Sequence, residues 1–388
     1  MTLWEDRTNQ WPKGTPLTHA LIIGTSAYRH ISDGPEPKQN IDFGLSQVTT
    51  PCAGAFAFAK WLRDEYHNPE SPLGTIRLLL SPSVVETSND PELAAAQVDR
   101  ALTARVRQAL FEWHDACDGN RDYMAMLYLS GHGVQRTKLD GNVLLEDFGV
   151  DPMVVDGSVD VFAVQQGMAG DTIAQRQFYF IDACRTQPDE FRNWKNLGQG
   201  LALPETFGGA DERCAPIYFA ASPDAQAFGR PGDGTLFAAA LIESLRKLAA
   251  SLDDDGRFVV SSHSLGEALE KRVASLAAAH SEVQSPAPSG LMRYGVVHVY
   301  AKPPEVPISI LVDPAQAAGV SRLTLRSYAS IAIDNEPANP NPVERTVPMG
   351  FYTLQIDASA PFVSQELPFN ARPRRDGSPP EPQRVVLQ

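Results

Sequence analysis

The 388-residue chain is poor in several features that would assign it to other classes of protein. It has only four cysteines, with no C-x-x-C spacing, and a chain of this size does not need disulfides to hold a core together. It has no excess of positive charge, because 33 basic and 47 acidic residues give a net charge of −14, and such a chain is unsuited to wrapping nucleic acid. It also lacks an apolar run near the about 20 residues that span a bilayer.

Three motif classes are missing as well. The start of the chain, Met1–Arg7, lacks the charged-then-apolar plan of a signal peptide, so we expect a cytoplasmic protein with reduced thiols. There is no G-x-S-x-G elbow and no G-x-x-x-x-G-K-[ST] loop, so a serine esterase or a nucleotide-binding enzyme finds no support.

Short apolar runs alternate with helical patterns over the first 300 residues. The runs predict buried strands at 19–24, 75–80, 123–129, 177–182, 216–222 and 294–300. Helices are predicted at 51–66, 91–115, 160–169, 235–249 and 262–279. Alternation of this kind predicts an α/β fold with a mostly parallel six-stranded sheet flanked by helices.

The pattern changes at Lys302-Pro303-Pro304. Beyond it prolines are dense, and short alternating runs at 307–312, 322–328, 351–356 and 384–387 predict a small all-β sandwich. We therefore expect three parts, which are an N-terminal strap at 1–18, an α/β domain at 19–302 and a β-sandwich-like accessory domain at 303–388.

Two predicted strands end in chemically reactive residues. The strand at 177–182 leads into Asp182-Ala183-Cys184, and the strand at 123–129 leads into Ser130-Gly131-His132-Gly133. Reactive groups of open α/β sheets gather at the carboxyl ends of the strands, so a thiol and an imidazole are expected to meet there. Cys52, Cys117 and Cys214 have no such partner motif and are predicted to be structural.

These two motifs, with 52 positions between His132 and Cys184, resemble those of caspase-like cysteine peptidases, especially bacterial and metacaspase-type members. Asp182 stands where caspases carry Gln, which is metacaspase-like, and Thr186 stands where they carry Gly. The order of the elements is also similar over residues 17–301. The accessory domain lies outside the resemblance.

The resemblance implies the roles of the site residues. Cys184 would be the nucleophile, and His132 would hold the thiolate as an ion-pair partner and protonate the leaving amine. The backbone N–H groups of Gly133 and Cys184 would form the oxyanion hole. The family usually works with this dyad alone, and the chain shows no third member.

Two further residues are candidates for substrate binding. Asp182 shares a strand face with Cys184, and metacaspase-type enzymes use the matching carboxylate to select Arg or Lys before the cut bond. The expected substrates are therefore proteins or peptides with a basic residue at the cleavage site. Ser222, at the end of a later strand, is a weaker candidate for the pocket wall. Alternatively, Asp182 caps the strand end or binds Arg185.

Relatives in bacteria often serve stress, cell-death or anti-phage programmes and are commonly kept latent. The segment 185–214 contains four basic residues where the chain could cleave itself or be cleaved by an upstream protease. These possible processing sites are Arg185, Arg192, Lys195 and Arg213. A regulatory protein is a second possible partner.

Asp253-Asp254-Asp255-Gly256 looks faintly like a calcium loop, but it lacks the alternating ligands and the glutamate at position twelve. A solvated turn is predicted instead. No metal site or cofactor is expected, although calcium activation stays open because some metacaspases need it. Two alternatives also stay open, namely a catalytically silent caspase-like scaffold, and a C-terminal domain that merely covers the rest instead of docking partners.

Overall fold

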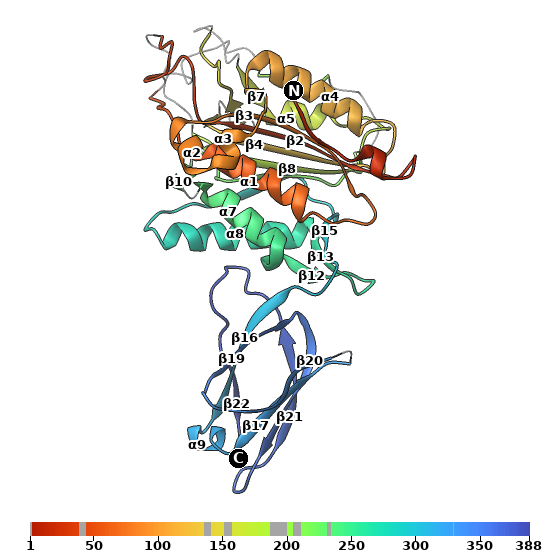
Figure 1. The fold of residues 1–388 in the computed structure, drawn as a ribbon, viewed down its shortest axis with the longest axis vertical. Coiled ribbons are helices and arrows are strands. Elements are labelled where there is room, and N and C mark those ends of the chain that lie inside the picture. The colour runs from red at the N-terminus through yellow and green to blue at the C-terminus, as the bar shows by residue number, and fades with distance from the viewer. Residues whose placement is uncertain are drawn as a thin grey trace.

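The computed structural model of the protein describes residues 2–38, 44–135, 141–150, 157–186, 200–204, 211–230, 234–328 and 330–388. Among the described residues of the first 300, the central element is a seven-stranded sheet (Figure 1). Its strand order is β1-β3-β2-β4-β8-β9-β14. Its strands are β1 (Leu3–Asp6), β2 (Thr18–Thr25), β3 (Leu73–Ser81), β4 (Met124–Gly131), β8 (Arg176–Ala183), β9 (Ala215–Phe219) and β14 (Ala287–Leu291). The five inner strands are parallel, and β1 and β14 are antiparallel edge strands.

Helices cover both faces of the sheet (Figure 1). One face is covered by α1 (Pro51–Asp64), α7 (Leu236–Glu243) and α8 (Ser262–Ala278), and the other by α4 (Thr103–Cys117) and α5 (Val161–Gly167). Successive residues of β8 point to opposite faces, so Phe178 and Phe180 belong to the first core and Tyr179 and Ile181 to the second. Burial on both faces explains why the inner strands are continuous apolar runs in the sequence.

The first five predicted strands are confirmed, and the sixth is placed differently. Val296–Val299 forms β15, which joins β13 (Phe258–Ser261) and β12 (Ala250–Leu252) in a separate antiparallel sheet. The edge strand that pairs with β9 is instead β14. Its sequence does not resemble a strand because it contains Pro288 and Gly290, which are typical of sheet edges and not of strand interiors. The polar start of the chain, which was predicted to be a strap, contains the edge strand β1.

The predicted helix at 91–115 is broken in the middle. After α2 (Val84–Asn89) come α3 (Pro91–Ala95) and, separately, α4. Between α3 and α4 the chain runs beside the end of β3, where Leu80 N–H donates to Asp99 O and Ala101 N–H donates to Ser81 Oγ. These long-range bonds replace helical ones. The helix predicted at 235–249 is α7 followed by one π-helical turn, η2 (Ser244–Leu248).

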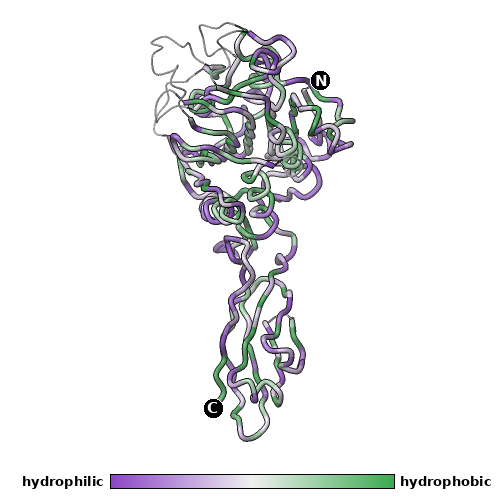
Figure 2. Tube along the Cα trace, turned by 90° about the vertical axis from the view of Figure 1, so that its left-hand side faces the viewer, coloured by the Kyte–Doolittle hydropathy of each residue, from purple (hydrophilic) through white to green (hydrophobic). Residues whose placement is uncertain are grey.

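Residues from Glu305 onward form two sheets around their own apolar core, as predicted for the sandwich. They extend away from the first 300 residues as an elongated unit (Figure 2). One sheet contains β19 (Val343–Pro348), β16 (Glu305–Asp313) and β22 (Gln383–Val386), and the other β18 (Ile331–Pro337), β17 (Ser321–Arg326), β20 (Gly350–Ala358) and β21 (Gln365–Ala371). A short helix, α9 (Ala315–Ala318), joins β16 to β17. The loop after β21 contacts the α/β part, because Arg375 donates to Leu248 O and Arg272 donates to Asp376 O.

The described residues also contain several short elements. They are η1 (Thr8–Gln10), β5 (Gly133–Val134), β6 (Asn142–Leu144), β7 (Ser158–Asp160), β10 (Gly229–Arg230) and β11 (Gly234–Thr235). Strands β5, β6 and β7 form a small antiparallel sheet that directly follows the histidine motif.

Candidate active site

The cysteine and histidine motifs lie on neighbouring parallel strands, β8 and β4. Ser130 pairs with Asp182 at the strand ends, and beyond the sheet Val134 forms a parallel bridge with Thr186. In both pairs the second residue comes 52 positions after the first. Cys184 also comes 52 positions after His132, so these two residues lie opposite each other. Neighbouring strands are about 4.8 Å apart, which brings the two residues to one edge of the sheet.

The Cys184 thiol is half-buried, whereas Cys52, Cys117 and Cys214 are buried, and all four are free. Its Sγ accepts a hydrogen bond from Ala227 N–H at 3.2 Å and lies 3.6 Å from Ala227 O. Burial raises the pKa of the Cys184 thiol, and the Ala227 N–H counteracts this in part. The nearby Asp182 carboxylate also raises the pKa.

His132 is held from a loop that the sequence did not single out. Its Nε2 lies 2.6 Å from the carbonyl oxygen of Ser46, and its backbone N–H donates to Tyr28 Oη at 2.7 Å. The rings of Tyr28 and His132 are 5.0 Å apart. Because a carbonyl can only accept, Nε2 carries the proton of the neutral imidazole, and Nδ1 is left as the basic nitrogen.

Burial lowers the pKa of His132, partly offset by the bond to Ser46. The raised thiol pKa and the lowered imidazole pKa both favour the neutral forms of the two groups. The sequence predicted a thiolate–imidazolium ion pair. Burial opposes such a pair, because it withdraws both groups from water and disfavours their charged forms, and the ion pair stays a prediction.

Gly133 lies against the backbone of the cysteine. A Cβ at this position would lie 2.0 Å from Cys184 O and 2.8 Å from Ala183 Cβ, so only glycine fits. Leu144 N–H donates to His132 O, which makes Gly133 and Val143 a pair without mutual hydrogen bonds. The β5–β6 ladder therefore does not use the Gly133 N–H.

Gly133→Ala is expected to lower kcat/KM by about 100-fold or more, because the added methyl group pushes the β5 backbone away from Cys184. Peptidase kinetics and the urea midpoint of the variant would measure this. Gly319→Ala is the matched control, since its Cβ would meet only Gln316 O at 3.6 Å. Wild-type kinetics in Gly133→Ala would contradict the close approach.

Asp182 is buried, with 3% of its surface exposed, on the face of the sheet covered by α1 and α7. Its Oδ2 accepts hydrogen bonds from Tyr128 Oη at 2.7 Å and from Thr235 Oγ1 at 2.5 Å. Its Oδ1 has no hydrogen-bond partner among the described residues. Burial raises the pKa of Asp182 to about 6, although the hydroxyl bonds oppose the rise.

Thr235 is also the N-cap of α7, because its Oγ1 accepts from Ala238 N–H. Helix α1 approaches the same point at Gly54, where a Cβ would lie 2.9 Å from Ala238 Cβ and 3.1 Å from Thr235 Oγ1. The carboxylate is thus enclosed by two helices and the sheet. Neither Tyr128 nor Thr235 has a sequence signature, since each becomes relevant only through these long-range contacts.

Arg185 does not bind Asp182. Its guanidinium lies 4.2 Å from the centre of the Phe219 ring, which belongs to the opposite face of the sheet. Its backbone is bonded in both directions, with Arg185 N–H donating to Ala225 O and Asp224 N–H donating to Arg185 O. Of the two alternatives for Asp182, the ion pair with Arg185 is therefore wrong.

The predicted processing sites fall into two groups. Arg185 and Arg213 are buried, and Arg213 is paired with Asp211 at 2.6 Å. Neither offers the exposed, extended backbone that a protease needs. Arg192 and Lys195 lie outside the described residues and stay predictions.

Ser222 lies just after β9, and its hydroxyl donates to Ser285 O at 3.0 Å. The turn predicted at Asp253–Gly256 connects β12 to β13, and the Asp253 carboxylate accepts from Arg257 Nε. Within the described ranges, no cluster of three His, Cys, Asp or Glu side chains could hold a metal ion. Nor is any helix there long and apolar enough to cross a bilayer.

The molecule thus belongs to the α/β proteins that bring a cysteine and a histidine together at the carboxyl ends of two adjacent parallel strands. A family model described as the caspase domain of peptidase family C14 matches residues 18–289, and the chain therefore belongs to the caspase-like cysteine peptidases. Among solved structures it is similar to caspase-1 from Spodoptera frugiperda, with 14% identity, a TM-score of 0.42, and coverage of 71% of this chain and 87% of that chain. No curated protein matches the sequence.

Proposed function

We propose that the chain is a cysteine endopeptidase that cleaves proteins after arginine or lysine. The observation that carries the proposal is Asp182. A buried carboxylate with one oxygen that has no partner among the described residues, two residues before the half-buried Cys184, is suited to receive a cation at the cleavage site. Buried side-chain polar atoms usually have a hydrogen-bond partner, so the unpartnered Oδ1 is a place where a substrate cation would be favourable.

The chemistry starts from a neutral thiol and a neutral imidazole, which are the forms that burial favours. As Cys184 Sγ attacks the scissile carbonyl carbon, its proton passes to His132 Nδ1, while Ser46 O keeps the proton on Nε2. The N–H groups of Gly133 and Cys184 would stabilise the oxyanion. The imidazolium then protonates the leaving amine, and water hydrolyses the thioester with His132 as base.

The carboxylate of Asp182 is already oriented for a basic side chain. Because Tyr128 and Thr235 hold one of its oxygens in place, binding does not require the group to reorganise. Ser222 would contribute to the wall of this pocket near residue 285.

Regulation and cellular role extend the proposal. Four free thiols fit a reducing cytoplasm, and the protein would act there in stress, cell-death or anti-phage responses. Latency would end by cleavage at Arg192 or Lys195, by the chain itself or by an upstream protease. The sandwich at 303–388 would form a separate domain that docks substrates or a regulatory protein.

A panel of fluorogenic peptides with Arg, Lys, citrulline or Asp before the cut bond tests the specificity. We expect turnover of the Arg and Lys peptides at least about 100-fold above the citrulline and Asp peptides, as a buried charge pair predicts. The measurement is made with and without calcium and after limited trypsin treatment. Silence of the folded protein towards all peptides under every condition would favour the scaffold alternative.

A further inference from the structure

One loop contacts His132 at two separate points. Tyr28, near the start of the loop between β2 and α1, receives the His132 N–H and packs against the imidazole. Ser46, near the other end of the loop, accepts the bond from Nε2. The imidazole keeps its orientation and tautomer only while both contacts persist.

The side chain of Gln47 joins these two points. Its Oε1 accepts the N–H of Tyr28 at 2.7 Å, and its Nε2 donates to the carbonyl of Tyr28 at 2.8 Å and to that of Ser32 at 3.3 Å. The amide thus pairs with the main chain of Tyr28 on both sides, as a neighbouring strand would. Ser46 is the residue next to Gln47, so this clamp sets the distance between the Ser46 carbonyl and the Tyr28 ring.

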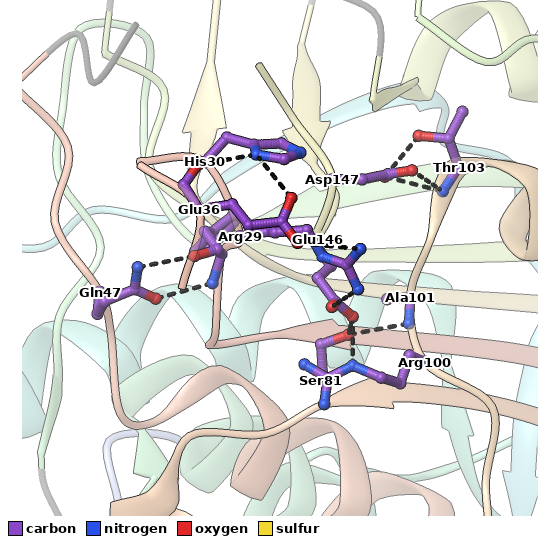
Figure 3. Close-up of polar contacts among 11 residues, drawn as sticks. Arg29, His30, Glu36, Gln47, Ser81, Arg100, Ala101, Thr103, Glu146 and Asp147 are labelled. Carbon is purple, nitrogen blue, oxygen red and sulfur yellow. Dashed lines mark hydrogen bonds and ion pairs between the residues drawn. The ribbon is translucent and has the colours of Figure 1, made fainter. Parts of the chain in front are cut away.

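The Tyr28 end of the loop has a second anchor in the body of the protein. Arg29 N–H donates to the carbonyl of Glu146 at 2.8 Å. The carboxylate of Glu146, which is buried, binds Arg100 Nε at 2.6 Å, Ser81 Oγ at 2.7 Å and Arg29 Nη2 at 3.5 Å (Figure 3). Tyr28 is therefore fixed to the edge of the sheet independently of Gln47.

The Ser46 end has its own contacts among the described residues. Leu45 and Val48 are only partly buried against a small apolar cluster that contains Tyr28, and Val48 N–H donates to Ser26 O at 3.2 Å. Ser46 itself is exposed. Beside these contacts, the Gln47 amide supplies the shortest polar bonds between this end of the loop and Tyr28.

We propose that Gln47 is a positioning residue that holds the Ser46 carbonyl on His132 Nε2 and so keeps the Nδ1 nitrogen as the base for Cys184. The inference rests on the proposed function, because it concerns the same dyad. Gln47 reaches His132 only through Tyr28 and Ser46. Its removal should therefore affect the proton-transfer step and leave peptide binding unchanged.

The test uses the full chain with Gln47→Ala and Gln47→Glu. The second variant keeps an acceptor for the Tyr28 N–H but sets a carboxylate oxygen against the Tyr28 carbonyl. For a peptide with Arg before the cut bond, we expect kcat to fall about tenfold in both variants, with KM within about twofold of wild type. Gln108→Ala is the matched control, because this exposed side chain on α4 bonds only to Glu112, and it should behave as wild type.

A second measurement does not depend on turnover. The rate at which iodoacetamide alkylates Cys184, located by mass spectrometry, should also fall about tenfold in both Gln47 variants, because the base no longer withdraws the thiol proton. Unchanged kcat and alkylation rates, or a change in KM alone, would overturn the proposal. If wild type cleaves no peptide, the proposed function fails, while the alkylation rates still decide the role of Gln47.

Discussion

Cys184→Ala is expected to lower kcat/KM for Arg and Lys peptides by at least about 10⁴-fold, because no other group can form the thioester. The half-buried sulfur makes only weak contacts with Ala227, so its loss should leave the fold intact. Initial rates and circular dichroism of the purified variant measure both expectations. The same variant, incubated alone, should show none of the fragments that self-cleavage at Arg192 or Lys195 would give in wild type.

Cys214→Ala is the control for losing a thiol elsewhere. Cys214 lies next to the sheet, where its sulfur contacts Arg293 O at 3.0 Å, and it is buried. We expect this variant to retain near wild-type activity and self-processing. Turnover of the peptides by Cys184→Ala would show that the nucleophile lies elsewhere, and processing that persists in this variant would remove the self-cleavage idea.

Asp182→Asn is expected to abolish the preference for basic residues. Removing one partner of a buried charge pair costs about 2–5 kcal/mol, which corresponds to an about 30- to 4,000-fold loss in kcat/KM for the Arg peptide. The citrulline peptide, which is similar in shape but neutral, should be cleaved about equally by the variant and by wild type. An Arg preference retained in the variant would show that another group forms the pocket.

The preference for the Arg peptide over the citrulline peptide should also depend on pH. The pKa of Asp182 is raised to about 6, so the free enzyme loses the carboxylate charge as the pH falls through about 6. The ratio of kcat/KM for the Arg and citrulline peptides should then drop about tenfold per pH unit. The ratio cancels the titration of His132 and Cys184, which act on both peptides. In Asp182→Asn it should be flat.

Stability should report the same carboxylate independently of any substrate. Because the folded pKa is raised from 3.8 to about 6, the protonated form favours the fold, and this contribution is lost as the pH rises from about 4 through 6. The full effect is on the order of 3 kcal/mol. In urea unfolding, wild type should therefore lose up to about this much relative to Asp182→Asn between about pH 4 and pH 7.5. A constant difference would mean that Asp182 titrates normally.

The test lies in the pH slope and not in the sign at one pH. The amide introduced by Asp182→Asn can keep its oxygen on Tyr128 and Thr235, which places its NH₂ group at the Oδ1 position, where no described residue accepts a hydrogen bond. Leaving this buried group unsatisfied costs about 1–3 kcal/mol at every pH. That cost is the same at both ends of the titration and drops out of the comparison.

Much of the framework could be predicted from local sequence. Strands buried on both faces must be continuous apolar runs, so β2, β3, β4, β8 and β9 were visible as such. The two reactive motifs were found because they lie immediately after such runs. The alternating pattern beyond residue 303 predicted the sandwich for the same reason. The roles of Cys184, His132, Gly133 and Asp182 stay predictions until the variants are measured.

Other features depend on residues far apart in the chain. The Ser46 carbonyl is a backbone group that any residue could supply, and only the path of the loop brings it to His132. The broken helix before α4 and the edge strand β14 likewise follow from hydrogen bonds to distant strands, which outweigh local preference.

The sequence by itself therefore determined on which elements the candidate site residues stand, because periodicity and turn residues are local. Only the tertiary structure decided their state. It turned Arg185 onto Phe219 and away from Asp182, left one oxygen of Asp182 without a partner among the described residues, and shifted the pKa values of Cys184 and His132 towards their neutral forms. Each of these outcomes comes from burial, and burial is set by the packing of helices and strands that are distant in sequence.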